Sequence, residues 1–428
     1  MKNITIIALL LITFITNAQQ TPGNKQTKPI TIEGATAHLG NGQVIENSLI
    51  MFSEGKLTFV GSANTKIARN GLVIDGTGKH IYPGFIAPNS TLGLAEIDAV
   101  RATRDYDEVG AMNPHIRSII AYNTESKVVE SMRPNGVLMA QITPRGGRIS
   151  GTSSIVQLDA WNWEDAIIKE NDGIHLNWPS TYSRGRWWLG EPSTLKENKN
   201  YTKQVAELKN YFDNAIAYNA KNTTNNKPFD ALLELTTGKR TLFIHVDYEK
   251  GIIDAVNFVK DNNVKNIVIV GGYEANMVSD FLKKNEIPVL LQRTHALPNN
   301  TDEDYDLPFK LANQLVNSGV LVGLENSGDM ERMNTRNLPF LAGTCAAYGL
   351  DKETALSLIT LNTAKILGID KNVGSLEVGK DATLFISEGD ALDMRTNKLE
   401  KAFIQGRDIS LESHQTELYK RYSKKLGN

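Results

Sequence analysis

Four short polar runs follow stretches of the chain that have the apolar composition of buried strands. Their side chains include imidazoles, carboxylates and hydroxyls, which are groups that bind metals or exchange protons. The carboxyl ends of parallel strands meet at one edge of an open sheet or at one mouth of a closed barrel, which periodicity alone does not distinguish, so these runs are expected to converge there. The four runs are 89–91 (Asn-Ser-Thr), 245–247 (His-Val-Asp), 293–295 (Arg-Thr-His) and 325–329 (Glu-Asn-Ser-Gly-Asp).

One interpretation of these runs is a metal centre. One divalent metal, zinc by preference for imidazole and carboxylate, would be held by His245, His295, Asp247 and Asp329. Zinc needs about three protein ligands to bind and to lower the pKa of its water towards 7. The expected catalytic residues are then Asp329 and His245. Water would be activated by the metal or by Asp329, and His245 would bind metal or polarise the substrate. The alternative is that no metal is bound, that His245 is satisfied at a strand end and that the carboxylates pair with nearby arginines.

The elements that must position these residues are clearest in the second half of the chain. Apolar runs of strand length alternate there with stretches of helical periodicity, and repeated βα units imply a parallel sheet. Strands are predicted at 242–246, 266–270, 287–291 and 320–324, and helices at 249–262, 274–285, 309–317, 338–348 and 351–367. The region 95–240 is less regular, with strands predicted near 136–143 and 154–159 and an insertion at about 175–230.

Both ends of the chain have a different pattern. From residue 30 to about residue 80, short alternating runs are separated by turn residues such as Gly40-Asn41-Gly42. The same style returns at 382–387 and 401–409. Hairpins this short need a second sheet to bury their faces, so we predict one β-sandwich built from both termini.

Three segments carry a resemblance to a known family. The run YPGFIAPNSTLGL (82–94) resembles the start of the barrel in the amidohydrolase superfamily, TLNTAKILGI (360–369) resembles its last barrel helix, and GSLEVGKDATLFI (374–386) its returning strand. The chain is similar to the imidazolonepropionase-like branch. GGRISGTSS (146–154), followed by QLDAWNWED, is similar to a secreted, degenerate subgroup. The resemblance implies a (β/α)8 TIM-like barrel with a small β-sandwich, in the α/β class.

The resemblance also implies a site, and this chain departs from it. The family binds metal with a His-x-His pair where this chain has Asn89 and Thr91, and neither side chain is a strong zinc ligand. His245 matches a further family histidine, while Gly271-Gly272 stands where another is often found. The family's catalytic aspartate matches either Glu325 or Asp329, of which Asp329 is preferred. The first metal clamp is therefore predicted to be lost.

Substrate binding is predicted at the same mouth. The residues expected there are Asn89, Thr91, Arg148, Arg293 and His295. The glycine-rich run around Arg148 could present backbone N–H groups to an anion, or it could be a simple turn. Five tryptophans between residues 161 and 188 could stack on a glycan, or they could pack the insertion against the barrel.

The N-terminus predicts export. Met1-Lys2-Asn3 precedes an apolar run that is too short to span a bilayer, and small residues follow before Gln19. We predict a signal peptide over 1–18, cleaved after Ala18, and a periplasmic or secreted protein without membrane contact afterwards. The remaining boundaries are 19–83 for the first part of the sandwich, 84–370 for the barrel and 371–428 for the second part and tail.

Composition limits the function further. A formal charge of −2 gives no electrostatic reason to expect nucleic acid as a partner. The leading hypothesis is a hydrolase acting on carbon–nitrogen bonds other than peptide bonds, with a small-molecule substrate. The alternative is an inactive binding or partner subunit of the same fold, as a homodimer or paired with an active relative. A glycan-binding module is a third hypothesis.

Overall fold

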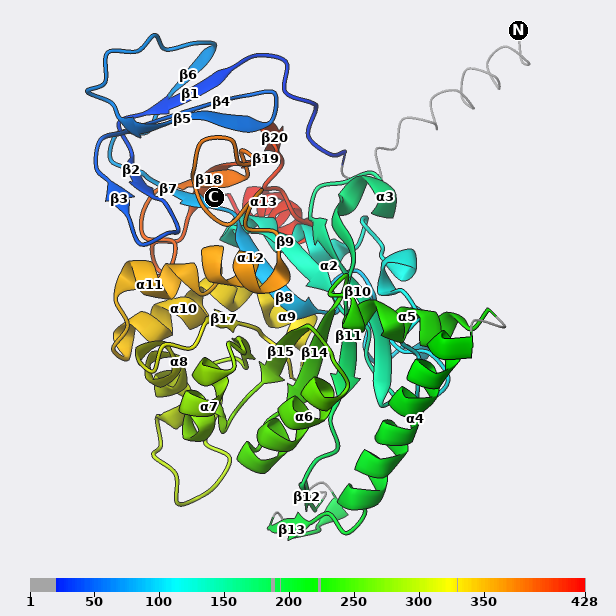
Figure 1. Cartoon of the computed structure of the whole chain (residues 1–428). Coiled ribbons are helices and arrows are strands. Elements are labelled where there is room, and N and C mark those ends of the chain that lie inside the picture. Colours follow the sequence, from blue (N-terminus) through cyan, green and yellow to red (C-terminus); the bar gives the residue numbers. More distant parts are fainter. Residues whose placement is uncertain (1–20, 186–188, 193, 222–224, 329, 428) are drawn as a thin grey trace, which may run out of the picture.

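The computed structural model of the protein describes residues 21–185, 189–192, 194–221, 225–328 and 330–427. Its centre is an eight-stranded sheet curved into a barrel, with helices on the outside (Figure 1). The strands follow in the order β8 (Phe85–Ser90), β9 (Val137–Ile142), β10 (Ile149–Gln157), β11 (Ile167–Asn177), β14 (Thr241–Val246), β15 (Asn266–Gly271), β16 (Val289–Leu291) and β17 (Val322–Leu324). The predicted fold class is confirmed.

One strand of the barrel runs against the others. The pairs β8–β9, β11–β14, β14–β15, β15–β16 and β16–β17 are parallel, whereas β10 is antiparallel to both β9 and β11. A tight turn over residues 143–148 joins β9 to β10, in place of a crossover helix. Gly146 and Gly147 have φ values of 83° and 62° in this turn, which other residues rarely adopt. The turn therefore lies at the mouth where the parallel strands end.

The barrel is closed by residues that the sequence pattern assigned to a helix. The backbone N–H of Leu324 in β17 donates to Leu358 O (3.1 Å), and that of Ile86 in β8 donates to Ile359 O (3.0 Å). The helix predicted at 351–367 is wrong as one element: it is split into α11 (Lys352–Ser357) and α12 (Leu361–Leu367). The carbonyls between them face the open edges of the sheet instead of continuing a helix.

The outer helices bury the stripes that their periodicity predicts. In α6 (Glu249–Asp261), Ile252, Val256 and Val259 are fully buried against the barrel. The covering layer continues through α7 (Ser279–Lys284), α8 (Leu307–Asn317) and α10 (Leu338–Ala347) (Figure 1). Cys345, in α10, is buried among apolar side chains.

The β-sandwich draws on both ends of the chain. One sheet has the order β5 (Lys56–Ser62), β4 (Ser48–Ser53), β1 (Ile30–Glu33), β6 (Leu72–Asp75). The other has the order β20 (Arg407–Ile409), β19 (Leu399–Ile404), β18 (Leu384–Ser387), β7 (His80–Pro83), β2 (Thr36–His38), β3 (Val44–Ile45). Residues from both halves, such as Ile32, Phe52, Leu384 and Phe403, share its core. Figure 1 shows the blue and orange strands side by side at one end of the barrel.

The insertion forms a hairpin and two helices beside the barrel. These elements are β12 (Tyr182–Arg184), β13 (Leu195–Glu197), α4 (Tyr201–Lys221) and α5 (Lys227–Thr236). Phe212 of α4 and Trp178 both pack on Phe258 of α6, with ring centroids 5.3 Å apart in each pair. Trp178 is 5% exposed and Trp161 is 65% exposed, while Trp187 and Trp188 lie outside the described residues.

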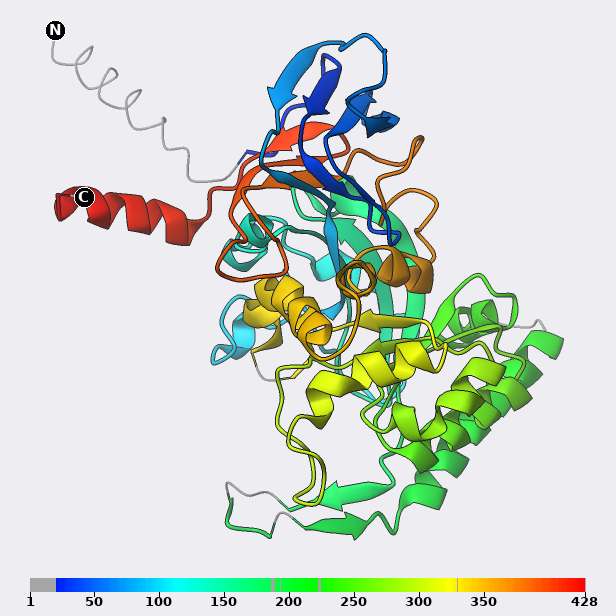
Figure 2. The ribbon, with the colours of Figure 1, turned by 90° about the vertical axis from the view of Figure 1, so that its left-hand side faces the viewer.

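The final helix, α13 (His414–Lys425), projects from the body on the side of the sandwich (Figure 2). Across the described residues, none of the helices has the length and apolar character needed to cross a membrane. The predicted signal peptide, 1–18, lies outside the described residues.

Candidate active site at the barrel mouth

The first barrel strand ends in a bulge. The register between β8 and β9 moves from Ala87↔Ala140 to Ser90↔Ile142, so β8 has one residue more than its partner over this stretch. Asn89 has φ 51°, a left-handed conformation that asparagine tolerates better than most residues. Its backbone N–H donates to Gln141 Oε1 of β9 at 3.0 Å. The bulge fixes the side-chain direction of Asn89 at the mouth.

Asn89 joins a cation to a carboxyl group. The Arg145 guanidinium donates to Asn89 Oδ1 at 2.9 Å and to Asn89 O at 2.8 Å. The amide of Asn89 in turn donates to Glu325 Oε2 at 3.2 Å. Arg145 belongs to the β9–β10 turn, and its backbone N–H is fixed by a 2.6 Å bond to Tyr106 O.

The neighbours of Asn89 hold a second carboxylate. Glu331, the first residue of α9 (Glu331–Asn334), is buried and accepts from Ser90 Oγ and Thr91 Oγ1, both at 2.6 Å. The backbone N–H of Thr91 lies 3.2 Å from both Glu331 oxygens. The Arg145 guanidinium is 3.9 Å from Glu331 Oε2. Residues 89–91 therefore bind both members of one ion pair.

Glu325 follows β17 directly and is fully buried. Burial raises the pKa of its carboxyl to about 7, against the lowering effects of hydrogen bonds from Ser327 and of the Arg145 charge. The Ser327 backbone N–H and hydroxyl each donate to it at 2.6 Å. The carboxyl is therefore close to half protonated at neutral pH.

A chain of hydrogen bonds runs from the mouth into the barrel. His245 Nε2 lies 2.9 Å from His175 Nδ1, and His175 Nε2 lies 2.9 Å from Ser153 Oγ. The Ser153 hydroxyl donates to Asp172 Oδ1 at 2.7 Å, so Ser153 accepts from His175. Burial lowers the pKa of His245 to about 3 and that of His175 well below its usual value, so both rings are neutral. His245 then donates through Nε2 and keeps its lone pair on Nδ1.

Comparison with known proteins places this architecture in a family. A model described as "Amidohydrolase family" matches residues 310–409. A 5-methylthioadenosine/S-adenosylhomocysteine deaminase of Thermoanaerobacter pseudethanolicus is 24% identical over 81% of this chain and 82% of that protein. An imidazolonepropionase of Shewanella frigidimarina is 29% identical, over 30% of this chain and 27% of that protein. These matches support the amidohydrolase superfamily as the family of this chain.

Solved amidohydrolase structures share the fold. An amidohydrolase from Thermotoga maritima superposes with a TM-score of 0.77, at 24% identity, over 89% of this chain and 99% of that one. A zinc-bound adenosine deaminase from Xanthomonas campestris has a TM-score of 0.55, at 13% identity, over 92% of this chain and 97% of that one. Metal dependence is typical of the superfamily, so it matters whether the side chains at this mouth could hold a metal ion.

The described side chains do not fit the superfamily's metal. Within the described ranges, no group of three or more His, Cys, Asp or Glu side chains is placed to hold an ion. His245 Nε2 is already engaged by His175, and Asn89 and Thr91 are occupied by Arg145 and Glu331. Asp329, one of the predicted ligands, lies outside the described residues.

The other predicted residues are dispersed. His295 is exposed and bonds Thr344 Oγ1 of α10 at 2.7 Å, so it does not join His245. Asp247 accepts from the backbone of Tyr273, after β15. Arg148 donates to Asn177 O at 2.7 Å, and the guanidinium of Arg293 lies beside Gly328 in the run after β17.

Several residues of this site are not among those that the sequence predicts. They are Gln141, Arg145, Ser153, Asp172, His175 and Glu331. Arg145 could be predicted from the sequence, because it follows a predicted strand just as Asn89 does. His175 is not predicted as a site residue because the sequence pattern places the start of the insertion there. In the structure it lies in strand β11.

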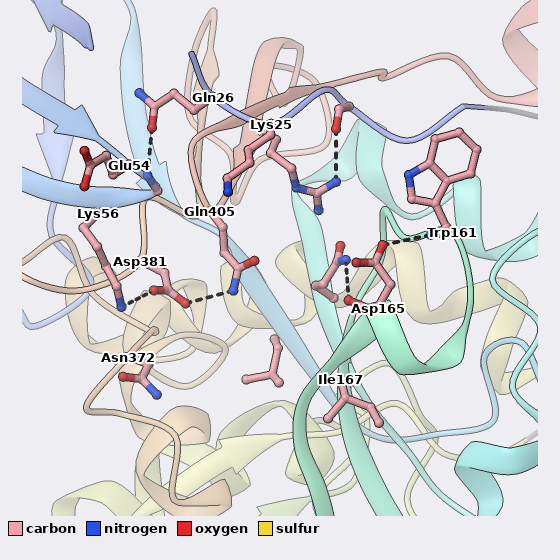
Figure 3. A pocket seen from close by; sticks show the side chains of 15 residues that line it. Lys25, Gln26, Glu54, Lys56, Trp161, Asp165, Ile167, Asn372, Asp381 and Gln405 are labelled. Atoms are coloured by element: carbon pink, nitrogen blue, oxygen red, sulfur yellow. Dashed lines mark hydrogen bonds and ion pairs between the residues drawn. The ribbon is translucent and has the colours of Figure 1, made fainter. Parts of the chain in front are cut away.

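A cavity of about 650 Å³ lies at the end of the barrel opposite the mouth, where the sandwich joins it. Lys56 pairs with Asp381 at 2.5 Å, and Gln405 donates to the same carboxylate at 3.3 Å. Both interactions are drawn in Figure 3. Gln26, from the segment that precedes β1, accepts from Gly55 N at 2.8 Å. These bonds connect the two halves of the sandwich, and the cavity is remote from the groups at the mouth.

Proposed function

We propose that the protein hydrolyses a carbon–nitrogen bond, other than a peptide bond, in a small molecule. Family membership supports this class of reaction. One relative that matches most of the chain is named as a deaminase, an enzyme that removes an amino group from carbon. The barrel mouth supports it as well, because catalytic groups of α/β barrels gather at this end.

The observation that carries the proposal is the environment of Glu325. A carboxyl with a pKa of about 7 can accept a proton and return it at neutral pH, which is what a general base and acid must do. It stands directly at the end of the last barrel strand and contacts Asn89 at the end of the first. Asp329 is the alternative for this role, and the test below separates the two.

The proposed reaction is a simple hydrolysis. The Glu325 carboxylate takes a proton from a water molecule as the water oxygen attacks the substrate carbon. A carbon–oxygen bond forms, the Arg145 guanidinium donates to the substrate oxygen as charge develops on it, and the carbon–nitrogen bond breaks. Glu325 returns its proton to the leaving nitrogen. His245 orients the substrate through Nδ1.

The test is turnover by the purified protein on cyclic amides, lactams and amino-substituted heterocycles. Glu325→Gln should lower kcat by at least about 100-fold, the usual range for loss of a general base. Asp329→Asn should change it little. If Asp329→Asn abolishes turnover while Glu325→Gln does not, the acid–base role belongs to Asp329. Glu164→Gln, at an exposed position far from the mouth, is the matched control.

An inactive binding or partner subunit is the second candidate. It is favoured by one observation, that the positions matching the family's His-x-His pair hold an ion pair. Such a protein would bind a small ligand without consuming it, as a homodimer or beside an active relative. Ligand-induced thermal stabilisation without any turnover, together with the mass of the particle from light scattering, would support it.

We also propose that the chain is exported to the periplasm or the medium. The proposal rests on the charge, apolar length and small residues of segment 1–18. Fractionation of producing cells, followed by N-terminal sequencing, tests it. A mature chain starting at Gln19 would support export, and an uncleaved cytoplasmic chain would overturn it.

A further inference from the structure

Arg145 binds the residue that matches the first position of the superfamily's metal clamp. Its guanidinium is 2.9 Å from the side-chain oxygen of Asn89, the residue that matches the first histidine of the His-x-His pair. Thr91, which matches the second, is bonded to Glu331, the counter-charge of Arg145. Both matched positions therefore already serve one arginine–glutamate pair.

Arg145 is fixed among the polar groups of the mouth. Its guanidinium donates to both oxygens of Asn89 and lies 3.9 Å from Glu331 Oε2. Its hydrogen bond to Asn89, whose amide donates to Glu325, places the guanidinium between the ends of the first and the last barrel strands. The side chain is 26% exposed, so part of the guanidinium remains available to a ligand.

A cavity of about 650 Å³ opens beside this arginine. Thr91, Tyr106, Arg145, Glu331 and Arg332 are among its lining residues. A ligand entering it meets guanidinium N–H donors, which bind carbonyl and carboxylate oxygens well. The cavity therefore fits a small molecule that presents such an oxygen to the mouth.

We infer that Arg145 replaces the superfamily's metal as the fixed cation of the barrel mouth, and that it binds a carbonyl or carboxylate oxygen of the ligand. A divalent cation placed among the same groups would be repelled by this guanidinium and would lack free donors. This inference concerns what the mouth binds, so it can be tested without any turnover.

The experiment measures zinc affinity in four proteins by competition with a chromogenic chelator. They are the natural protein, the double variant Asn89→His/Thr91→His, the same double variant with Arg145→Gln, and the double variant with Arg148→Gln as control. Asn89→His suits the left-handed backbone, which histidine tolerates. Only the protein without Arg145 should bind zinc tightly, at least about 100-fold more tightly than the double variant. Removing Arg145 takes a positive charge away from the zinc site and also frees the Glu331 carboxylate from its ion pair.

Two outcomes among these four proteins overturn the inference, and a third concerns a fifth protein, the double variant with Arg145→Lys. One is that the double variant binds zinc as tightly with Arg145 as without it. The other is that the natural protein itself holds about one zinc ion per chain after mild chelation. Arg145→Lys in the double-variant background keeps the positive charge. It gives a second test of the inference if the glutamine variant does not fold. It should gain no zinc affinity, and a gain equal to that of Arg145→Gln would show that space, not charge, excludes the metal.

Discussion

Arg145 donates hydrogen bonds to both oxygens of Asn89, at 2.9 Å to the side chain and 2.8 Å to the backbone. The two residues are far apart in sequence, yet they join the end of β8 to the turn after β9. These bonds fix Asn89 in the β8 bulge, and the side-chain amide of Asn89 donates to Glu325. This pair decides which charges the barrel mouth presents.

Removing the cation should change the acidity of the mouth. Arg145 lowers the pKa of Glu325, so Arg145→Ala should raise that pKa above its present value of about 7, by about 1 unit for a charge at this range. If the enzyme proposal holds, the pH–rate profile should move up with it. Carbon-13 NMR titration of labelled glutamate measures the same shift without turnover. Arg148→Ala, in the same turn, is the control, and an equal shift there would contradict the prediction.

Glu325 should also make the stability of the fold depend on pH. Its pKa is raised from 4.5 to about 7, so the folded state binds a proton that the unfolded state releases. The contribution of Glu325 to stability should be fully present below pH 4.5 and should be lost as the pH rises through about 7, by about 3 kcal/mol at most.

Urea unfolding at pH 5 and pH 8 measures this dependence. Glu325→Gln should lose most of the difference between the two conditions and should be the more stable protein at pH 8. Glu164→Gln should keep the difference. If Glu325→Gln unfolds with the same pH dependence as the natural protein, the buried carboxyl is not its source.

The hydroxyl of Ser153 should be needed for the buried chain of bonds. Ser153→Ala leaves His175 and Asp172 without the group that joins them, and buried polar groups left unpaired cost about 1–3 kcal/mol. Denaturant unfolding measures the loss. Ser154→Ala is the matched control. The Ser154 hydroxyl accepts from the backbone N–H of Asn171 and does not join two buried side chains, so its removal should cost less. Equal losses would show that Ser153 has no special role.

The tryptophans should differ in their effect on stability. Trp178 packs on Phe258 and donates from Nε1 to the Tyr201 hydroxyl at 3.0 Å, so Trp178→Ala should destabilise the fold by about 3–5 kcal/mol. Trp161, which is 65% exposed, should cost far less when replaced by alanine. Thermal unfolding of the two variants compares them directly. A large loss in Trp161→Ala would indicate that the cavity between sandwich and barrel, which Trp161 lines, is part of the core.

Much of the fold could be predicted, because local patterns encode it. Apolar runs of strand length and helical stripes are properties of neighbouring residues, and they predicted β14 to β17 and the helices around them. The direction of β10 could not be read in this way, since a strand pattern is the same in both directions. The break at 358–360 was hidden for a different reason. The residues there suit a helix, and only the open edges of the distant strands β8 and β17 recruit their carbonyls.

Only the site residues that lie at the ends of predicted strands could be predicted from the sequence. This rule indicated Asn89, His245 and Glu325, which the structure places on β8, on β14 and after β17. It could not indicate that Arg145 and Glu331 would occupy the side chains of 89–91, because those contacts depend on a turn and a helix start far along the chain. The partner of His245 was missed because strand β11 was not recognised.

The pairing of β7 with β18 has a consequence for how the chain is made. His80–Pro83 lies beside Leu384–Ser387 in the middle of a sheet, so the first domain to leave the ribosome waits for nearly the last residues to be synthesised. The barrel waits as well, because residues 358–360 close it. Nascent chains should thus remain incomplete until translation is almost finished, and truncations before residue 384 should leave an unpaired strand that is prone to aggregate.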